Sequence, residues 1–397
     1  MRKIRSVLLA ILCLALSFCP SAQAITLDAN SAIQELQLGS QAYYLFDVTN
    51  NEVVMAKDAD KVMKVASLTK IMTALVIIEN RQLDEIVTIT RPMISNLYDY
   101  VVVGLRVGQK VSVEDLLYAL LLPSAGDAAQ ALAISTSGSI AGFANQMNAR
   151  AAQLGLKNTH FSNPTGMDND NYSTAHDIAV LLQEATKNAT FKQIFETYEW
   201  NMKSINKKIE KTYKPRDHIH GGKTGYTGQA GRCFASTATI EGVDYLMVNL
   251  GANSNTSNHI NDAEKIYAYI ESHFEQQTVI EEGKLAQTLQ VKDSFQETTD
   301  LYTESSFSDL LPADLDHDKI EYVYEGMTII TRDVALNAKV GQYIAKYNGE
   351  ELGRVDLFLR DEINFLNYPL IAACVVGGAV IAVAIACLIR ALIRRHR

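Results

Sequence analysis

The stretch VASLTKIMTALVIIEN, residues 65–80, contains one serine and one lysine three positions apart, Ser67 and Lys70. Residues three apart share one face of a helix, and the apolar run behind them predicts a buried helix that begins at Ser67. Free backbone N–H groups and the positive dipole at such a helix end suit a developing oxyanion. A desolvated lysine one turn along can lose its proton near neutral pH and act as a base. The stretch equally fits a helix cap beside a surface lysine.

The same spacing occurs a second time, at Ser204 and Lys207. The surrounding sequence, KSINKKIEK, is polar and has no apolar face, which predicts a solvated hairpin or loop. The spacing therefore does not identify a nucleophile without its surroundings.

Strand patterns lie at both ends of a helical middle. Residues 42–60 predict a hairpin that turns at Asn50-Asn51, and a second hairpin over RCFASTATI and VDYLMVNLGA turns at Glu241-Gly242. Four helices are predicted between the hairpins: one over residues 113–122, one that begins at 127, one that follows a Ser139 cap, and one in STAHDIAVLLQEATKN. A further helix is predicted after the second hairpin, over residues 261–274. This order predicts an α/β (α+β) domain with one sheet built from both ends of the segment and helices packed on it.

The two ends of the chain predict an exported, anchored protein. Basic residues, an apolar run and Ala22-Gln23-Ala24 predict a signal peptide over 1–24 that is cleaved after Ala24. Residues 370–389 carry no charge, which predicts a transmembrane helix, placed at 368–390, and arginines follow it. Because basic residues stay inside, residues 391–397 are expected in the cytoplasm and the rest outside the cell membrane. The segments between are expected to be a main domain over 25–275 and a small all-β domain over 276–363.

Composition excludes some classes of function. Cys233 is the one cysteine outside the two terminal apolar segments, so no internal disulfide is expected in the main domain. The net charge of −9 argues against nucleic acid as a partner. We expect no metal or other cofactor, because the cluster Asp314, Asp316, His317 and Asp318 lacks the glycine and terminal glutamate of an EF-hand.

Two further stretches carry candidate site residues. Ser124 lies in LLPSAGDAA, in a break between two helices, where its side chain can face a ligand. Lys223, Thr224 and Gly225 lie in HGGKTGYTGQAG at the start of a predicted strand, which as an edge strand can pair with an extended peptide. The lysine and threonine could hold a carboxylate, and the glycine would let a substrate backbone approach. A Pro-Ser turn and a glycine-rich turn explain the same stretches without function.

Together the three stretches resemble the serine penicillin-recognising enzymes, whose motifs are S-x-x-K, S-x-N and K-[ST]-G. The chain is most similar to the D-alanyl-D-alanine carboxypeptidases among the low-molecular-weight penicillin-binding proteins. ASLTKIMTAL, LLLPSAGDAAQALA, FSNPTGMD, GGKTGYTGQAGRC and GEELGRVDLFLRDEI carry this resemblance, which extends from about residue 38 to 363. It implies a β-lactamase/transpeptidase-like fold for the main domain.

The resemblance also implies roles for single residues. Ser67 is expected to form the acyl-enzyme, Lys70 to accept its proton, and Ser124 to relay protons to the leaving D-alanine. Lys223 and Thr224 would hold the substrate carboxylate, and the backbone N–H groups of Ser67 and Tyr226 would form the oxyanion hole. The substrate implied is the pentapeptide stem of peptidoglycan, and β-lactams would acylate Ser67 and be released slowly.

One departure keeps alternatives open. Gly126 occupies the position of the motif's asparagine, so the amide expected to contact the substrate and the lysine is missing. A catalytically weakened relative that binds wall peptides is therefore one alternative, and a β-lactamase or transpeptidase that uses the same acyl-enzyme is another. The chain has no E-x-x-L-N stretch to supply the deacylating glutamate of a class A β-lactamase.

Overall fold

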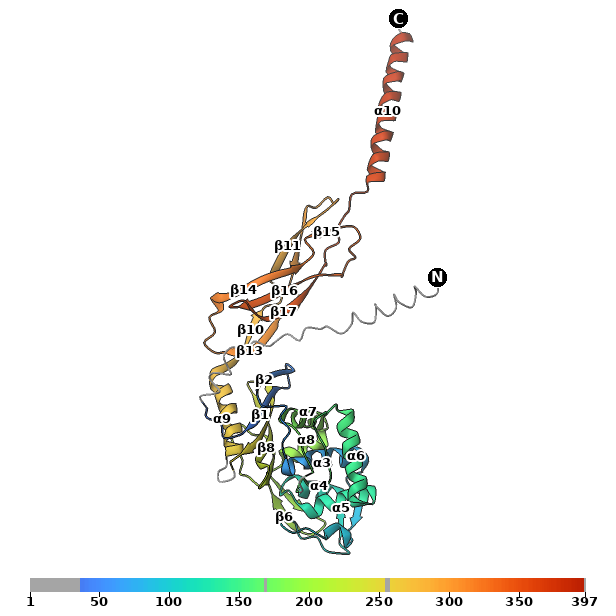
Figure 1. Ribbon diagram of the computed structural model, residues 1–397. Helices are drawn as coiled ribbons and strands as arrows, with labels where there is room; N and C mark the ends of the chain where they lie inside the picture. Colours follow the sequence, from blue (N-terminus) through green and yellow to red (C-terminus); the bar gives the residue numbers. More distant parts are fainter. Residues whose placement is uncertain (1–35, 168–169, 254–257, 396–397) are drawn as a thin grey trace, which may run out of the picture. The chain divides into compact units, whose positions relative to one another are not determined.

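The computed structural model describes residues 36–167, 170–253 and 258–395, and the expected signal peptide lies outside them. The described chain divides into two compact units. One unit holds the residues up to Gln276 together with Leu310–Leu315, and the other holds Gln277–Asp309 and the residues from Asp316 on. The chain's path through both units is shown in Figure 1.

The first unit is built on an antiparallel five-stranded sheet in the order β2-β1-β9-β8-β7. Its strands are β1 (Ala42–Asp47), β2 (Glu52–Lys57), β7 (Gly221–Thr227), β8 (Gly231–Ile240) and β9 (Val243–Ala252). The first and last segments of the unit pair directly, with Tyr44 opposite Val248. The predicted sheet made from both ends is confirmed, and β7 lies at its edge.

Helices cover both faces of this sheet (Figure 1). One face packs on a core with α3 (Thr69–Asn80), α4 (Val113–Leu121), α5 (Gly126–Ser137), α6 (Ile140–Gln153), α7 (Ala175–Thr186) and α8 (Ala189–Glu196). The other face packs on α9 (Asn258–His273). Successive side chains of β9 point to opposite faces of the sheet and so belong to different cores. Leu246 and Val248 belong to the core under the six helices, and Tyr245 and Met247 belong to the core under α9.

Local sequence signals fix several helix starts. Ser139 caps α6 by accepting a hydrogen bond from the Gly142 N–H at 3.0 Å, and Thr174 caps α7 in the same way. The helix predicted to begin at Ser67 begins two residues later, because Ala66–Leu68 form a single 3-10 turn, η1. The helix predicted from Asp127, α5, begins at Gly126. The Asp127 carboxylate instead accepts hydrogen bonds from the backbone N–H groups of Val103, Gly104 and Leu105.

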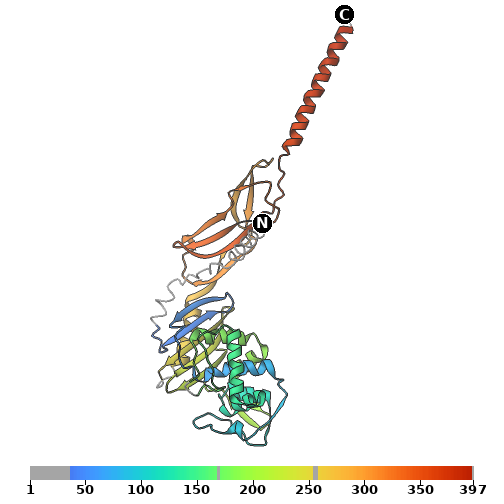
Figure 2. The ribbon, with the colours of Figure 1, turned by 45° about the vertical axis from the view of Figure 1, so that its right-hand side comes forward.

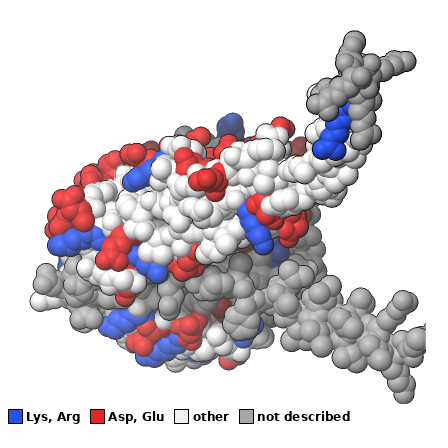
Figure 3. All heavy atoms as spheres, turned by 90° about the horizontal axis from the view of Figure 1, so that it is seen from above, with Lys and Arg blue, Asp and Glu red and all other residues white. Residues whose placement is uncertain are grey.

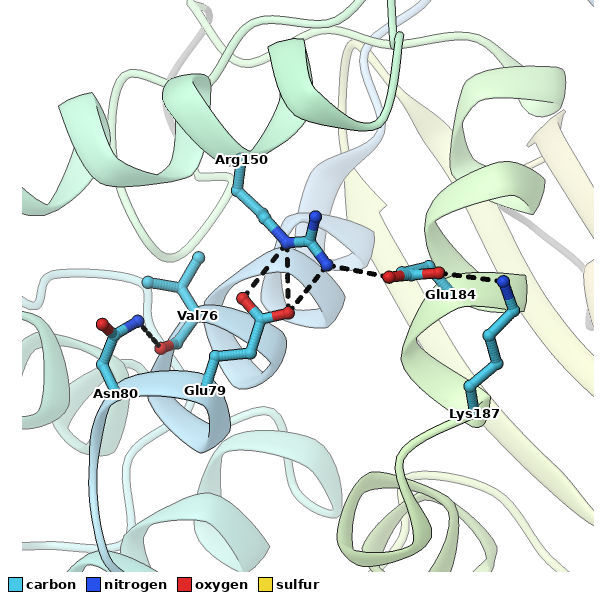
Figure 4. A network of polar contacts seen from close by, with 6 residues as sticks. All are labelled: Val76, Glu79, Asn80, Arg150, Glu184 and Lys187. Carbon is cyan, nitrogen blue, oxygen red and sulfur yellow. Dashed lines mark hydrogen bonds and ion pairs between the residues drawn. The ribbon is translucent and has the colours of Figure 1, made fainter.

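An ion-pair network joins three helices of the first unit (Figure 4). Arg150 on α6 contacts Glu79 on α3 at 2.8 Å and Glu184 on α7 at 2.8 Å. Glu184 also pairs with Lys187 at 3.0 Å. The network therefore holds the C-terminal end of α3 against α6 and α7. Two small two-stranded sheets complete the unit. One pairs β3 (Ile86–Thr88) with β4 (Lys110–Ser112), and the other is the hairpin of β5 (Glu199–Met202) and β6 (Lys207–Glu210).

The second unit is made of short strands followed by one helix. β12 (Thr298–Tyr302), β11 (Leu285–Val291) and β15 (Ile329–Ile330) form one sheet, and β14 (Ile320–Gly326), β16 (Lys339–Tyr347) and β17 (Glu350–Phe358) form another. β10 (Phe274–Ile280) pairs with β13 (Phe307–Pro312), and residues 274–276 and 310–312 of these strands belong to the first unit. The helix α10 (Tyr368–Arg395) is continuous in Figure 2. Its segment Tyr368–Arg390 is long and apolar enough to cross a membrane, with a mean hydropathy of 2.7.

Candidate active site

Ser67 and Lys70 form a buried, hydrogen-bonded pair. The Lys70 Nζ lies 3.0 Å from the Ser67 Oγ and donates a second hydrogen bond to the Thr165 carbonyl at 2.7 Å. Lys70 is 1% exposed, which excludes a surface lysine. Because both acceptors are neutral, no opposite charge offsets the loss of hydration, and burial lowers the pKa of Lys70 to about 7. At a pH near 7, neutral Lys70 that can accept a proton is therefore present.

The surroundings of the pair come from three segments. The turn η1 places Ser67 directly before α3, whose first turn carries Lys70. The Thr165 carbonyl comes from the loop that contains Asn163, whose side-chain oxygen accepts hydrogen bonds from the N–H groups of Thr165 and Gly166. The sequence Asn-Pro-Thr-Gly indicates such a turn, but nothing in it indicates that its carbonyl meets the lysine.

Ser124 and Lys223 form a second hydrogen-bonded pair. The Lys223 Nζ donates to the Ser124 Oγ at 2.9 Å and to the Thr224 carbonyl at 2.8 Å. Burial lowers the pKa of Lys223 well below its usual value, and the charges of Lys70 and Lys211 lower it further. Ser124 has a φ of +65°, a left-handed conformation that is strained for a serine. Such strain is common where a side chain must be aimed at a site.

The edge strand β7 brings the two pairs together. A Cβ built on Gly225 would lie 3.0 Å from the Ser67 nitrogen and 3.1 Å from the Val65 carbonyl oxygen. Only glycine allows the strand to run this close to η1 without displacing it. Beyond Gly225, Tyr226 is half-exposed, and the Arg232 guanidinium lies over its ring at 5.3 Å. The Thr224 hydroxyl shares a hydrogen bond with the Thr212 hydroxyl at 2.6 Å.

A third buried lysine, Lys211, lies behind β7 and was not predicted from the sequence. Its Nζ donates to the carbonyls of Phe195 and Gly222 at 2.7 and 3.0 Å. Burial lowers its pKa to about 7, although Glu196 acts in the opposite direction. Lys211 ends the polar stretch KSINKKIEK, so the sequence around it gave no signal of burial. When it is protonated, Lys211 lowers the pKa of Lys223.

The space beside Gly126 is filled by Tyr100. A Cβ at Gly126 would lie 2.3 Å from the Tyr100 Cδ1 and 3.1 Å from its Cβ, so Tyr100 would have to move to admit any side chain. The Gly126 N–H donates to the Val101 carbonyl at 2.7 Å, which holds this loop against the start of α5. The Thr165 hydroxyl lies 3.4 Å from the Tyr100 hydroxyl. Sequence reasoning found the missing asparagine but not the aromatic ring that takes its place.

The other candidates contact residues outside these two pairs. Ser204 and Lys207 lie at the β5–β6 hairpin, where Lys207 donates to the Val103 carbonyl and Ser204 contacts Ser112 and Asp115. His317 contacts Gln277, and Asp316 pairs with Lys319, in a short exposed turn. Among the described residues, no group of three or more His, Cys, Asp or Glu side chains could hold a metal ion. Acidic and basic side chains are interspersed on the face shown in Figure 3.

Comparison with known proteins gives one family. Residues 28–254 match the family described as D-alanyl-D-alanine carboxypeptidase. The chain is 26% identical to D-alanyl-D-alanine carboxypeptidase DacF of Bacillus subtilis over 358 residues, which cover 88% of this chain and 91% of that protein. It is 30% identical to the D-alanyl-D-alanine endopeptidase of Escherichia coli over 273 residues, which cover 66% of this chain and 86% of that protein.

A solved structure agrees on the fold. The crystal structure of the D-alanyl-D-alanine carboxypeptidase DacD from Francisella tularensis matches with a TM-score of 0.66 at 20% identity and covers 83% of this chain and 94% of that one. The chain belongs to the D-alanyl-D-alanine carboxypeptidase family of serine peptidases.

Proposed function

We propose that this chain is a serine DD-carboxypeptidase that removes the terminal D-alanine from the pentapeptide stems of peptidoglycan. The proposal rests on two hydrogen-bonded pairs, Ser67 with Lys70 and Ser124 with Lys223, which β7 brings together. A buried serine next to a lysine of near-neutral pKa is the arrangement that nucleophilic catalysis requires.

In the first half of the reaction, the Ser67 Oγ attacks the carbonyl carbon of the penultimate D-alanine and its proton passes to the Lys70 Nζ. The negative charge that develops on the carbonyl oxygen is received by the backbone N–H groups of Ser67 and Tyr226. Ser124 passes its hydroxyl proton to the nitrogen of the leaving D-alanine and takes up the proton held by Lys70, and the C–N bond breaks. In the second half, water attacks the ester carbon and gives up a proton to Lys70. That proton returns to the Ser67 Oγ as the ester C–O bond breaks and the shortened peptide leaves.

Lys223 and Thr224 hold the terminal carboxylate of the substrate. Lys223 has a lowered pKa because it is buried beside two other lysines. A bound carboxylate supplies the opposite charge and raises that pKa, so substrate binding is coupled to protonation of Lys223. This makes recognition specific for a peptide with a free C-terminal carboxylate. The bicyclic β-lactams carry a carboxylate in the corresponding position and acylate Ser67.

The chain is exported and anchored in the cell membrane by α10, with the catalytic unit outside the cell. Cleavage after Ala24 removes the signal peptide. The limits of the parts are 25–275 for the catalytic domain, 276–363 for the β domain, 368–390 for the transmembrane helix and 391–397 for a cytoplasmic tail. The apolar length of Tyr368–Arg390 and the arginines after it support this arrangement.

Release of D-alanine tests the proposal directly. The full chain in detergent would be incubated with a pentapeptide ending in D-Ala-D-Ala, with the same peptide ending in D-Ala-L-Ala, and with the D-Ala-D-Ala peptide amidated at its C-terminus. We expect D-alanine from the first peptide and little release from the amidated peptide, because Lys223 and Thr224 require the carboxylate. The D-Ala-L-Ala peptide keeps its carboxylate and tests separately whether the site requires the D configuration of the leaving residue. Equal hydrolysis of the free and amidated peptides would contradict the role given to Lys223.

A further inference from the structure

The turn of residues 292–295, at the end of β11, holds the chain segment that leads into α10. The Leu366 N–H donates to the Asp293 carbonyl at 2.6 Å, and the Tyr368 hydroxyl donates to the Asp293 carboxylate at 2.8 Å. The Phe295 N–H and the Ser294 hydroxyl both donate to the Asn364 carbonyl. The turn is therefore fixed to the last residues before the apolar helix.

Large apolar side chains on this turn and beside it face solvent in the absence of a bilayer. Phe295 is 76% exposed, although it belongs to a residue type that is usually buried. Ile329 is 49% exposed and lies across from Gln290, because β15 runs parallel to the end of β11. Its neighbour Ile330 is fully buried, so the outward side chain of β15 is also apolar.

The apolar span of α10 begins at Tyr368, two residues after the hydrogen bond from Leu366 to the turn. Two residues of chain reach at most about 7 Å, so a turn tied to Leu366 lies at the depth of the lipid headgroups if Tyr368 enters the bilayer. Aromatic side chains are enriched at that depth. The turn that carries Phe295 and the segment that follows β15 each contain one basic and one acidic neighbour. Lys292 is next to Asp293 in the turn, and Arg332 is next to Asp333 after β15, so the charges of each pair balance.

We infer that Phe295 and Ile329 form a membrane-contact surface of the β unit, with Phe295 inserted among the headgroups of the bilayer that α10 spans. The inference rests on the proposed anchoring by α10 and adds a second contact between the β unit and the lipid. Because the local charges balance, the contact depends on apolar and aromatic side chains and does not require anionic lipid.

Tryptophan fluorescence can test this contact in the full chain, because the sequence contains a single tryptophan, Trp200. Phe295→Trp places a second one on the turn. Tyr302→Trp is the matched control, because Tyr302 is 50% exposed and pairs with Leu285 at the opposite end of β11. That end lies about 20 Å along the strand from the turn. Each protein would be reconstituted in phosphatidylcholine vesicles, with and without lipids brominated on the acyl chains close to the glycerol.

Each variant's added emission is its fluorescence minus that of the wild type. We expect the brominated lipid to quench most of the emission added by Phe295→Trp and almost none of the emission added by Tyr302→Trp. Phosphatidylserine added to the vesicles should leave the quenching the same. Quenching of Phe295→Trp no stronger than that of Tyr302→Trp would overturn the inference while leaving the anchor in place. Failure of the wild type to float with the vesicles would overturn the anchor and the contact together.

Discussion

The chain contains the S-x-x-K spacing twice, and the two copies differ in everything except that spacing. Lys70 is 1% exposed and donates to Ser67, whereas Lys207 is exposed and donates to the Val103 carbonyl. Ser67 lies in η1 against β7, whereas Ser204 lies in the turn of the β5–β6 hairpin. The comparison shows that the motif acquires its chemistry from burial and from neutral hydrogen-bond partners, which the four letters do not specify.

The largest expected difference between the copies concerns the serines. Ser67→Ala should reduce D-alanine release by on the order of 10⁴-fold or more, because no nucleophile remains to form the ester. Ser204→Ala should leave the rate unchanged. Steady-state kinetics with the D-Ala-D-Ala pentapeptide would measure both. Substantial turnover by Ser67→Ala would show that Ser67 is not the nucleophile.

The next effect concerns the lysines. Lys70→Arg keeps a positive charge but cannot give up its proton, so acylation should fall by about 10³-fold. Lys207→Arg is the matched control at the second copy and should retain wild-type activity. Stopped-flow measurement of acylation by a fluorescent penicillin separates this step from hydrolysis. If the two variants behave alike, Lys70 is not the base.

Substitution of Gly126 tests whether the absence of the motif asparagine weakens the enzyme or whether the site is built around glycine. Gly126→Asn should reduce acylation by about 100-fold, because the new side chain overlaps Tyr100 and displaces the loop at Ser124. The double variant Gly126→Asn with Tyr100→Ala removes the overlap and should recover most of the loss. A gain of activity in Gly126→Asn alone would show instead that the missing asparagine had weakened the enzyme.

The pH dependence of acylation reports on Lys70. Since burial lowers its pKa to about 7, the fraction of neutral Lys70 rises about tenfold per pH unit below 7 and levels off above it. The acylation rate should follow this curve. The same shift affects folding: between pH 7 and 10.5 the unfolded chain binds more protons at this site, so the free energy of unfolding should rise with pH there. A rate that is flat from pH 5 to 9 would contradict the assignment.

The smallest expected effect concerns the C-terminal end of α3, the helix whose first turn carries Lys70. Arg150→Met removes the network of Glu79 and Glu184 in Figure 4 and should lower the free energy of unfolding by about 1 kcal/mol, because these ion pairs are partly exposed. Acylation should not change. Urea unfolding and penicillin acylation of the same sample would show whether the two properties are independent. A parallel loss of activity would mean that the network positions Lys70.

Much of the fold was predictable because its signals are local. Asn50-Asn51 and Glu241-Gly242 mark the two hairpin turns, and Ser139 marks a helix start through its capping hydrogen bond. The β-strand character after Gln276 and the apolar segment before the final arginines were also confirmed. The 3-10 turn at Ser67 was not predicted, because its geometry depends on packing against β7, which is about 160 residues away in the sequence.

The site was predictable only in part for the same reason. Ser67, Lys70, Ser124 and Lys223 belong to recognisable stretches, and the structure places them in two adjoining hydrogen-bonded pairs. Their roles in the reaction stay predictions. Lys211 and Tyr100 come from segments with no sequence signal of a site. Thr165 lies in the recognisable stretch FSNPTGMD, but nothing in that stretch indicates that its carbonyl contacts Lys70, because tertiary packing alone brings the two together.

The most direct test of the central claim is to locate the acyl group. The full chain would be labelled with penicillin at pH 5, 6, 7 and 8, digested, and analysed by tandem mass spectrometry of the peptides that contain Ser67, Ser124 and Ser204. The account predicts a single adduct on Ser67, formed faster as the pH rises to about 7. An adduct on another residue, or no adduct at any pH, would contradict it.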